Sequence, residues 1–379
     1  MVEITRLEAF TCRVALDTPI HFRFNTITHR DYTVVRVDTE DGHTGAAIGL
    51  SRGAPVDDAV LDMVAPVALG HDAMEIGAFH DRLSRHTASA DQYGIVALAR
   101  SLVDLAIWDI RGQLLEAPVW RLLGGASEPA PVLLVEGYEL PGESDQEFAK
   151  RLAARVEQGY RRLKLEAAGY DDPRVLRRRL ELTRELVGDG VELVVDVNGA
   201  WKSVREATTA IRAFAIEGVT WVEDPFPRHR IHDVGLLRHE VDVTLGAGDD
   251  VTSPMELFKL LHDHAVDVLR IDVTTLGGIV PTSDVIGAAR QYEVPVSTHA
   301  HPLFHQHLTF AWPTVRDVEL FPDDRPFEPS HKLVTGSLFG RVVDGHLPPP
   351  EQPGLGFDLD MAAVESSAIR RNAVSKEDL

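Results

Sequence analysis

The segment VELVVDVNGAW, residues 191–201, decides how this sequence folds. An apolar run of strand length ends in a carboxylate, Asp196, and then breaks at Gly199. This pattern indicates a buried strand that carries an acid at its carboxyl end. The same event recurs, one helix-length segment apart, in TWVEDP (220–225), VTLGAGDD (243–250), VLRID (268–272) and VPVSTH (294–299), the last of which ends in a histidine. A circle of strand ends that carry acids predicts a metal site.

The chain around this segment alternates strand and helix from Pro131 onward. Earlier strands are expected at 132–135 and 162–166, and an eighth at 318–321. Helices are expected at 145–158, 172–186, 203–217, 231–239, 254–263 and 281–291. Eight strands joined by seven helical crossovers indicate a closed parallel barrel, an α/β fold whose functional groups gather at the carboxyl ends of the strands.

The residues before the barrel form a separate α+β unit. Segments 2–14 and 32–39 alternate as strands do, and the turn at 40–43 joins the second to a third strand in a hairpin. Helical patterns follow at 56–69, 75–86 and 92–116, and a linker at 122–129. The irregular segment after Phe321 is expected to return to the first unit. We therefore divide the chain into an N-terminal capping domain (1–128), a barrel (129–321) and a C-terminal segment (322–379).

Composition excludes several classes of protein. The net charge of −21 argues against binding to a nucleic acid backbone. The single cysteine, Cys12, excludes an internal disulfide and a cysteine-based zinc cluster. No apolar run approaches the ~18 residues of a membrane helix, and the N-terminus lacks a signal-peptide pattern. We expect a soluble, cytoplasmic protein without membrane or nucleic acid partners.

Three acids on successive strands form the predicted metal site: Asp196, Glu223 and Asp249. Carboxylates held this close repel one another unless a cation lies between them. All-oxygen ligands favour Mg²⁺, with Mn²⁺ as a substitute, over zinc or copper. Asp250 neighbours Asp249, but adjacent strand residues face opposite ways, so only one of them can be a ligand, and we choose Asp249.

The next two strand ends carry Asp272 and His299. A carboxylate on one imidazole nitrogen fixes the tautomer and leaves the other nitrogen to accept a substrate proton. Lys164 lies on the strand that precedes the Asp196 strand. It would supply positive charge to a substrate oxygen, or act as a base if its pKa is lowered. Glu319, on the last strand, would donate a hydrogen bond to an oxyanion if neutral, or accept one from a substrate hydroxyl. His307 is interpreted as a packing residue, and the role of His301 is left open.

Together these motifs resemble the enolase superfamily, specifically its mandelate racemase-like branch (the mandelate racemase/muconate lactonizing enzyme family). The residues that carry the resemblance are Lys164-x-Glu166, Asp196-Val197-Asn198, Val222-Glu223-Asp224-Pro225, Gly248-Asp249, Asp272 with Gly277-Gly278, His299 and Glu319. The resemblance implies a modified (β/α)₇β TIM barrel under an N-terminal α+β capping domain completed by the C-terminal segment. It also implies one essential Mg²⁺, abstraction of the proton α to a carboxylate to give a metal-stabilised enediolate, and a homo-oligomer, from dimer to octamer.

Two residues depart from the family pattern. The branch usually carries Lys-x-Lys on the second strand, where this chain has Glu166, and a glutamate where it has Asp249. Racemisation needs an acid–base group on each face of the α-carbon, whereas elimination of a β-hydroxyl can use His299 alone. We therefore expect dehydration of a sugar acid. The alternatives are a racemase, epimerase or cycloisomerase in which Glu166 is the second base, and a non-catalytic barrel that binds a metal or a carboxylate.

Substrate specificity in this family comes from two loops of the capping domain, which correspond here to residues 19–30 and 49–55. Polar and cationic side chains in them, together with one residue of the barrel, are expected to suit a hydroxylated carboxylate. The candidate substrate-binding residues are His21, Arg23, His29 and Arg52 in the loops and Asn198 in the barrel.

Overall fold

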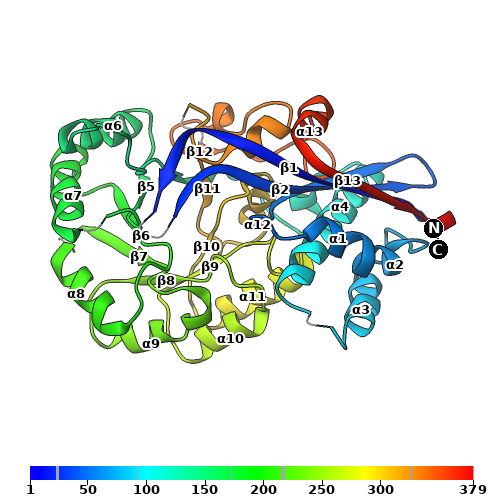
Figure 1. The fold of residues 1–379 in the computed structure, drawn as a ribbon, viewed down its shortest axis with the longest axis horizontal. Helices are drawn as coiled ribbons and strands as arrows, with labels where there is room; N and C mark the ends of the chain where they lie inside the picture. Colours follow the sequence, from blue (N-terminus) through cyan, green and yellow to red (C-terminus); the bar gives the residue numbers. More distant parts are fainter. Residues whose placement is uncertain (23–24, 91, 171, 215–217, 325–326, 379) are drawn as a thin grey trace.

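A curved sheet of parallel strands occupies the middle of the protein (Figure 1). The computed structural model describes residues 1–22, 25–90, 92–170, 172–214, 218–324 and 327–378. Within these ranges, eight parallel strands follow the order β10-β9-β8-β7-β6-β5-β4-β11. Their bounds are β4 Ala130–Val135, β5 Arg162–Glu166, β6 Glu192–Asp196, β7 Val219–Glu223, β8 Leu245–Ala247, β9 Val268–Ile271, β10 Val296–Thr298 and β11 Val318–Leu320. At the seam the Glu319 N–H donates to Thr298 Oγ1 at 3.2 Å, so the barrel is nearly closed.

One helix follows each of the first seven barrel strands among the described residues, which confirms the expected (β/α)₇β barrel. The helices are α6 Asp145–Glu157, α7 Pro173–Val187, α8 Val204–Phe214, α9 Asp233–Arg238, α10 Pro254–His262, α11 Ile279–Gln291 and α12 Pro302–Ala311. Helix α7 illustrates the pattern, because Leu176 and Leu180 are buried against the barrel while Arg177 is exposed. Residues 215–217, the expected end of α8, lie outside the described residues.

A second, antiparallel sheet caps one side of the barrel in the order β13-β1-β2-β3. Its strands are β1 Ile4–His21, β2 Thr26–Thr39, β3 Thr44–Leu50 and β13 Ala368–Ser375. Strand β1 is longer than expected. Beyond an irregularity between Ala15 and Ile20, it resumes its pairing with β2. Buried Leu16 and Ile20 pack with Val135 at the end of β4, and this contact holds the hairpin against the barrel mouth.

The helices of the cap are α1 Val56–Ala59, α2 Ala65–Ala68, α3 Ile76–His86, α4 Ile95–Leu114 and α5 Val119–Leu122, with a π-helical turn at Val60–Val64. They pack against the antiparallel sheet, and α4 and α5 also contact the barrel helices α11 and α12 (Figure 1). The Asp104 carboxylate of α4 accepts a hydrogen bond from the N–H of Ile279, at the start of α11, at 2.6 Å. Gly278 has φ +98°, and a Cβ there would lie 2.2 Å from Asp104 Oδ1. Only glycine permits this approach of cap and barrel.

The C-terminal segment crosses both units. Strand β12 (His346–Leu347) pairs with β4, and α13 (Met361–Ser367) leads into β13, which pairs with β1 of the cap. Helical 3₁₀ turns occur at Arg228–Arg230, Pro329–Leu333, Phe339–Arg341 and Lys376–Asp378. Buried His307 joins this segment to the cap, because Nδ1 accepts from the Trp120 N–H and Nε2 donates to the Leu355 carbonyl, each at 3.1 Å.

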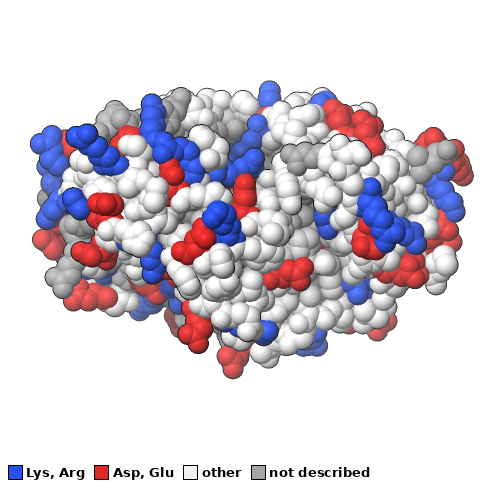
Figure 2. All heavy atoms as spheres, turned by 90° about the horizontal axis from the view of Figure 1, so that it is seen from below, with Lys and Arg blue, Asp and Glu red and all other residues white. Residues whose placement is uncertain are grey.

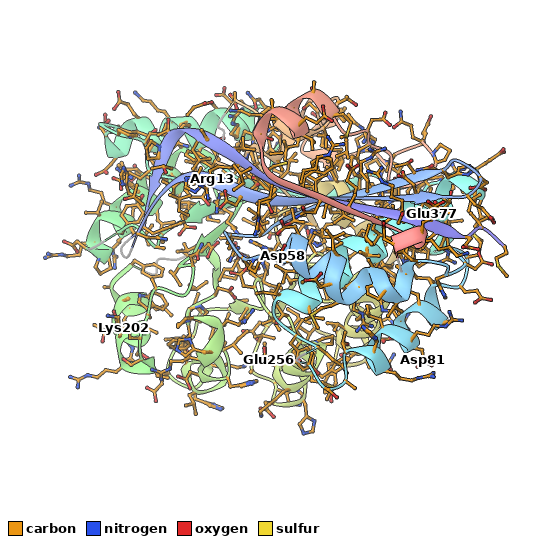
Figure 3. All side chains as sticks on the ribbon, turned by 45° about the vertical axis from the view of Figure 1, so that its right-hand side comes forward. Arg13, Asp58, Asp81, Lys202, Glu256 and Glu377 are labelled. Atoms are coloured by element: carbon orange, nitrogen blue, oxygen red, sulfur yellow. The ribbon has the colours of Figure 1, made fainter. Side chains whose placement is uncertain are left out.

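Charged side chains lie mainly on the outside of the molecule. In Figure 3, Asp58 and Asp81 extend from cap helices, and Lys202 and Glu256 from the barrel side. On the face drawn in Figure 2, acidic and basic groups of the described residues are interspersed rather than separated into two areas. Within the described ranges, no helix has the length and apolar character needed to cross a membrane.

Candidate active site

Three carboxylates converge where β6, β7 and β8 end. Asp196 and Glu223 are paired in register on neighbouring strands, and Asp249 follows β8. Each offers one oxygen, and these oxygens all lie within 4.8 Å of one another. All three side chains are buried. The structure thus brings together the three residues that the sequence indicated as metal ligands.

The protein pairs these carboxylates to different degrees, and Asp196 uses both oxygens, since its Oδ2 lies 3.0 Å from Lys164 Nζ. Asp196 Oδ1 accepts from the Asn198 N–H at 2.8 Å, and Glu223 Oε1 accepts from Lys164 Nζ at 2.6 Å. Asp249 Oδ1 accepts from Arg270 Nε at 2.7 Å. Glu223 Oε2 is buried without a hydrogen-bond partner among the described residues. An orphaned buried carboxylate oxygen beside two further carboxylates fits a divalent cation held by oxygen ligands.

Electrostatics support the same conclusion. Burial raises the pKa of Glu223, and Asp249 and Asp196 raise it further, although Arg270 and Lys164 oppose the rise. Like charges this close cannot all ionise cheaply without a counter-ion. A cation among the carboxylates would relieve that repulsion, so the donor set and its charge both fit a resident metal ion.

Lys164, on β5, is enclosed by carboxylates. Its Nζ lies 2.6 Å from Glu223, 2.8 Å from Glu319 and 3.0 Å from Asp196. Burial lowers the pKa of this amine, but the three carboxylates reverse the effect and raise it well above its usual value. These contacts favour the charged form of Lys164, which fits the first of the two roles considered from the sequence.

Arg270, on β9, is a second buried cation that the sequence analysis did not select. Its side chain is fully buried and contacts Asp249, Glu223 and Glu319. The sequence held one signal of this role. Arg270 is the only charged residue in the apolar run 268–271, and it faces the same side of the strand as Asp272, two residues further on.

Asp272 and His299 form a hydrogen-bonded pair. His299 Nδ1 donates to Asp272 Oδ2 at 3.0 Å, since an ionised carboxylate can only accept. Nε2 is directed to the metal side, 3.9 Å from Asp249 Oδ2. Burial lowers the pKa of His299, but Asp249 and Asp272 more than compensate and raise it to about 9. The geometry leaves Nε2 as the nitrogen available to a substrate.

Glu319 lies between the two buried cations. Oε2 accepts from Lys164 Nζ at 2.8 Å and from Arg270 Nη2 at 2.5 Å, and Oε1 accepts from the Ala300 N–H at 3.0 Å. Burial raises the pKa of Glu319, but Lys164 and Arg270 lower it below its usual value. An ionised Glu319 accepts hydrogen bonds, which favours the second of the two roles considered from the sequence.

Glu166 is buried at the end of β5, opposite Asp196 in register. Oε1 accepts from the Ala168 N–H at 2.8 Å. Burial and the neighbouring Asp196 raise the pKa of Glu166 well above its usual value, while Ala168, Lys164 and Asn198 oppose the rise. Asn198 itself has a left-handed backbone (φ 45°) and an exposed side chain.

The cap contributes one arginine to this region. Arg52, whose φ is +52°, forms an ion pair with Asp250 in which both side chains remain partly exposed, and the Asp250 carboxylate raises the pKa of Arg52 above its usual value. Asp250 thus faces the cap while Asp249 faces the metal site. His21 is exposed and its Nδ1 lies 3.1 Å from Thr26 Oγ1, and His29 lies near Asp31. Arg23 lies outside the described residues.

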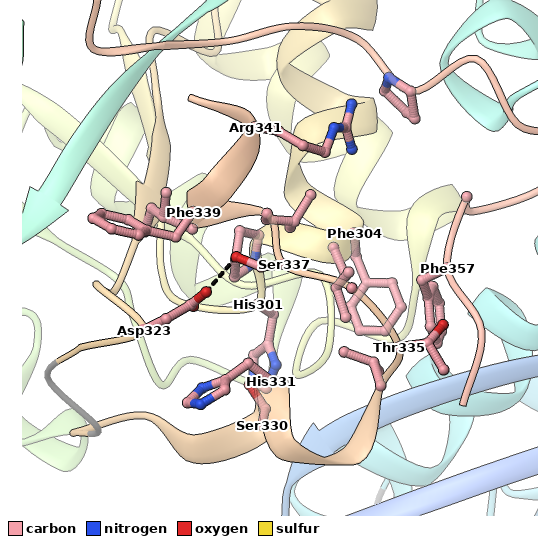
Figure 4. Close-up of a pocket in the computed structure, with 18 of the residues that line it drawn as sticks. His301, Phe304, Asp323, Ser330, His331, Thr335, Ser337, Phe339, Arg341 and Phe357 are labelled. Carbon is pink, nitrogen blue, oxygen red and sulfur yellow. Dashed lines mark hydrogen bonds between the residues drawn. The ribbon is translucent and has the colours of Figure 1, made fainter. Parts of the chain in front are cut away.

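A cavity of about 620 Å³ lies beside the strand ends, between α12 and the C-terminal segment (Figure 4). Phe304, Phe339 and Phe357 line it together with Arg341 and His301. His301 is buried in a left-handed conformation, and its Nε2 has no hydrogen-bond partner among the described residues. His301 thus lines the cavity and is two positions along the chain from His299, the candidate base.

Two domain families match most of the chain. The family described as mandelate racemase / muconate lactonizing enzyme, N-terminal domain, matches residues 5–124, and the family described as enolase C-terminal domain-like matches residues 147–363. The chain belongs to the enolase superfamily. Membership confirms the resemblance drawn from the strand-end motifs.

Relatives within the enolase superfamily carry out different reactions. The chain is 24% identical to an N-succinyl-L-Arg/Lys racemase from Bacillus cereus, over 98% of this chain and 100% of the relative. It is 27% identical to an L-talarate/galactarate dehydratase from Salmonella typhimurium, over 90% of this chain and 83% of the relative. The fold matches an L-talarate dehydratase from Polaromonas sp. JS666, complexed with Mg and L-glucarate, with a TM-score of 0.87, 24% identity and coverage of 99% and 100%.

Proposed function

We propose that this enolase-superfamily enzyme is a Mg²⁺-dependent sugar-acid dehydratase. The observation that carries the proposal is the asymmetry of the site. His299, aligned by Asp272, directs Nε2 to the metal side, whereas the position usually held by a second lysine carries Glu166, with one oxygen bound to a backbone N–H. Dehydration needs proton transfer on one face only.

His299 would act twice in this reaction. Nε2 first takes the α-proton of the substrate, and the imidazolium then returns that proton to the β-hydroxyl as its C–O bond breaks. The products are water and an enol that tautomerises to a 2-keto-3-deoxy acid, so atoms balance without a further reactant. Asp272 holds the proton of Nδ1 throughout and stabilises the imidazolium.

Asp196, Glu223 and Asp249 would hold the Mg²⁺. When bound there, the ion supplies a Lewis acid that fixes the substrate carboxylate and offsets the negative charge that develops on its oxygens. Lys164, kept cationic by its three carboxylates, would add positive charge on the β5 side. Glu319 would orient a substrate hydroxyl as an acceptor, since its two cationic neighbours keep it ionised.

The cap would close over the substrate from the side opposite the strands. Arg52 is already anchored at the barrel rim by Asp250, and His21, at the end of β1, lies close enough to the barrel for its carbonyl to contact a Cβ placed on Gly169. A polyhydroxylated carboxylate offers acceptors and donors to both kinds of group. This arrangement supports a sugar acid as the substrate class over an aromatic acid.

A library of mono- and dicarboxylic sugar acids tests the proposal. The enzyme is incubated with MgCl₂ and each acid in D₂O, ketone formation is followed with semicarbazide, and the α-proton is followed by NMR. We expect ketone from at least one acid and none with His299→Asn, which should still bind Mg²⁺. Ketone formation undiminished in His299→Asn would refute the base assignment.

Racemisation or epimerisation is the second candidate. The racemase relative, which this chain matches almost end to end, favours it, as does the raised pKa of Glu166, since a protonated carboxyl can deliver a proton to the second face. Deuterium entering the α-carbon without ketone would support this reaction, and Glu166→Gln would then lose activity as severely as His299→Asn. If neither ketone nor deuterium incorporation is seen with any acid of the library, the result would favour a binding protein without turnover.

A further inference from the structure

Arg270 occupies the centre of the buried charge cluster. Its Nε donates to Asp249 Oδ1 at 2.7 Å and its Nη2 to Glu319 Oε2 at 2.5 Å, with Glu223 Oε1 at 3.1 Å. Its Nη1 donates to Ser297 Oγ and to the Thr298 carbonyl, both at 2.7 Å. The guanidinium therefore contacts groups on β7, β10 and β11 and the residue Asp249 after β8, and the side chain is fully buried.

These contacts fix the aspartate of the metal site. Asp249 has a shorter side chain than a glutamate, and the Nε–H of Arg270 binds its Oδ1, which leaves Oδ2 for a metal ion. A group that orients a ligand in this way typically changes metal affinity by about 10- to 100-fold. A lysine could supply the charge but cannot make the same set of bonds.

The charge count gives Arg270 a second consequence. Among the groups that Lys164 and Arg270 contact, Asp196, Glu223, Asp249 and Glu319 carry four negative charges when ionised, against the two positive charges of Lys164 and Arg270. Two negative charges remain in this set, which a divalent ion would neutralise. Without Arg270 three negative charges would remain, which a trivalent ion would match better.

We propose that Arg270 sets the charge selectivity of the metal site, favouring a divalent over a trivalent cation, and positions Asp249 for binding. The proposal deepens the function proposed above, because it rests on the same metal site. Arg270 acts through the ligands and is a positioning residue, since it need not touch the substrate.

Calorimetric titration of the metal-free enzyme with MgCl₂ and with LaCl₃ tests this proposal. For Arg270→Gln, we expect the ratio of La³⁺ affinity to Mg²⁺ affinity to rise by about 10-fold or more over wild type, because the removed charge is buried and contacts two of the three carboxylates that would hold the ion. Arg228→Gln is the matched control. It removes an exposed arginine at the same rim, bonded to the Asp250 carbonyl, and should leave the ratio within about threefold, as expected for a screened charge.

Arg270→Lys keeps the charge and provides a second measurement if the glutamine variant does not fold, as judged by circular dichroism. We expect it to bind both ions about 10-fold more weakly, as for a lost orienting group, with an unchanged ratio. An unchanged ratio in folded Arg270→Gln, or wild-type affinities in Arg270→Lys, would overturn the proposal. Absence of Mg²⁺ binding by the wild type would overturn the metal site itself, whereas failure of the dehydratase reaction alone would show only in the sugar-acid library.

Discussion

Replacing Asp272 with asparagine should reverse the tautomer of the candidate base. Asp272 Oδ1 accepts two hydrogen bonds, from the N–H and the hydroxyl of Thr274, both at 2.7 Å. In Asp272→Asn these two donors would hold the amide oxygen, so the amide NH₂ would face His299. Nδ1 of His299 would then have to accept, which would move the proton to Nε2 and block the nitrogen that should take the substrate proton.

The size of the effect follows from the same contacts. Turning the amide over would place its NH₂ against the buried Thr274 N–H, and a buried unpaired donor costs about 1–3 kcal/mol. That cost leaves the productive orientation roughly 5- to 150-fold less populated than the blocked one. Loss of the negative charge that stabilises the imidazolium adds to this, and an analogous substitution in serine proteases lowers kcat by about 10⁴-fold. We expect kcat to fall by about 10²- to 10⁴-fold.

The assay is α-proton exchange in D₂O on a substrate found in the library, together with calorimetric Mg²⁺ affinity. The affinity should change less than about threefold, since Asp272 is not among the three clustered carboxylates. Thr274→Ser is the matched control, because it retains both donors and should keep near-wild-type exchange. Exchange above a third of the wild-type rate in Asp272→Asn would refute the tautomer argument, and a parallel loss of Mg²⁺ affinity would show a general disturbance instead.

Three further predictions address the metal, the cap contact and acid stability. Glu223→Gln should weaken Mg²⁺ binding roughly 100-fold by calorimetry, since it removes a ligand charge. Asp250→Asn should change the Mg²⁺ affinity less than about threefold, because that carboxylate pairs with Arg52. Similar losses of affinity in both variants would contradict the ligand assignment. Gly278→Ala should lower the free energy of unfolding, measured in urea, by about 2–4 kcal/mol, because of its positive φ and the clash with Asp104. The control Gly287→Ala, on open helix surface, should be neutral or stabilising. A loss below 1 kcal/mol in Gly278→Ala would be inconsistent with the clash. Burial lowers the pKa of His307 to about 4, below its unfolded value of 6.5. Its contribution to the free energy of unfolding should therefore be complete above pH 6.5 and should fall by about 3 kcal/mol towards pH 4. An equal pH slope in His307→Gln would rule His307 out as the cause.

Much of the site could be predicted because barrel geometry converts sequence order into neighbourhood. Strands that follow one another along the chain lie side by side, so acids at their ends must meet, as Asp196 and Glu223 do in register. Alternation along the strand indicated that only one of Asp249 and Asp250 could face the site, and the structure groups the chosen residue, Asp249, with Asp196 and Glu223. The same reasoning placed Asp272 beside His299, and the structure gives that pair a hydrogen bond.

The remaining features depend on side-chain packing between distant segments. Arg270 was missed because its partners lie on β8, β10 and β11, and one charged residue in an apolar strand does not identify them. The length of β1 was underestimated because Pro19 interrupts the alternation, whereas burial of Ile20 against β4 restores the pairing in three dimensions. The cavity beside α12 is formed largely by irregular chain after Phe321, which has no periodic pattern to interpret.

The pairing of β13 with β1 has a consequence for biosynthesis. Leu7 pairs with Val374, so one edge of β1 gains its partner strand only after 367 further residues have been synthesised. At about 5–20 residues per second, translation leaves that strand edge open for roughly 20–70 seconds. During this time the barrel strands emerge and can close first, while the nascent cap remains a three-stranded sheet with an exposed edge that can pair with other chains. Ribosome-bound intermediates therefore expose a strand edge that the complete fold covers with β13.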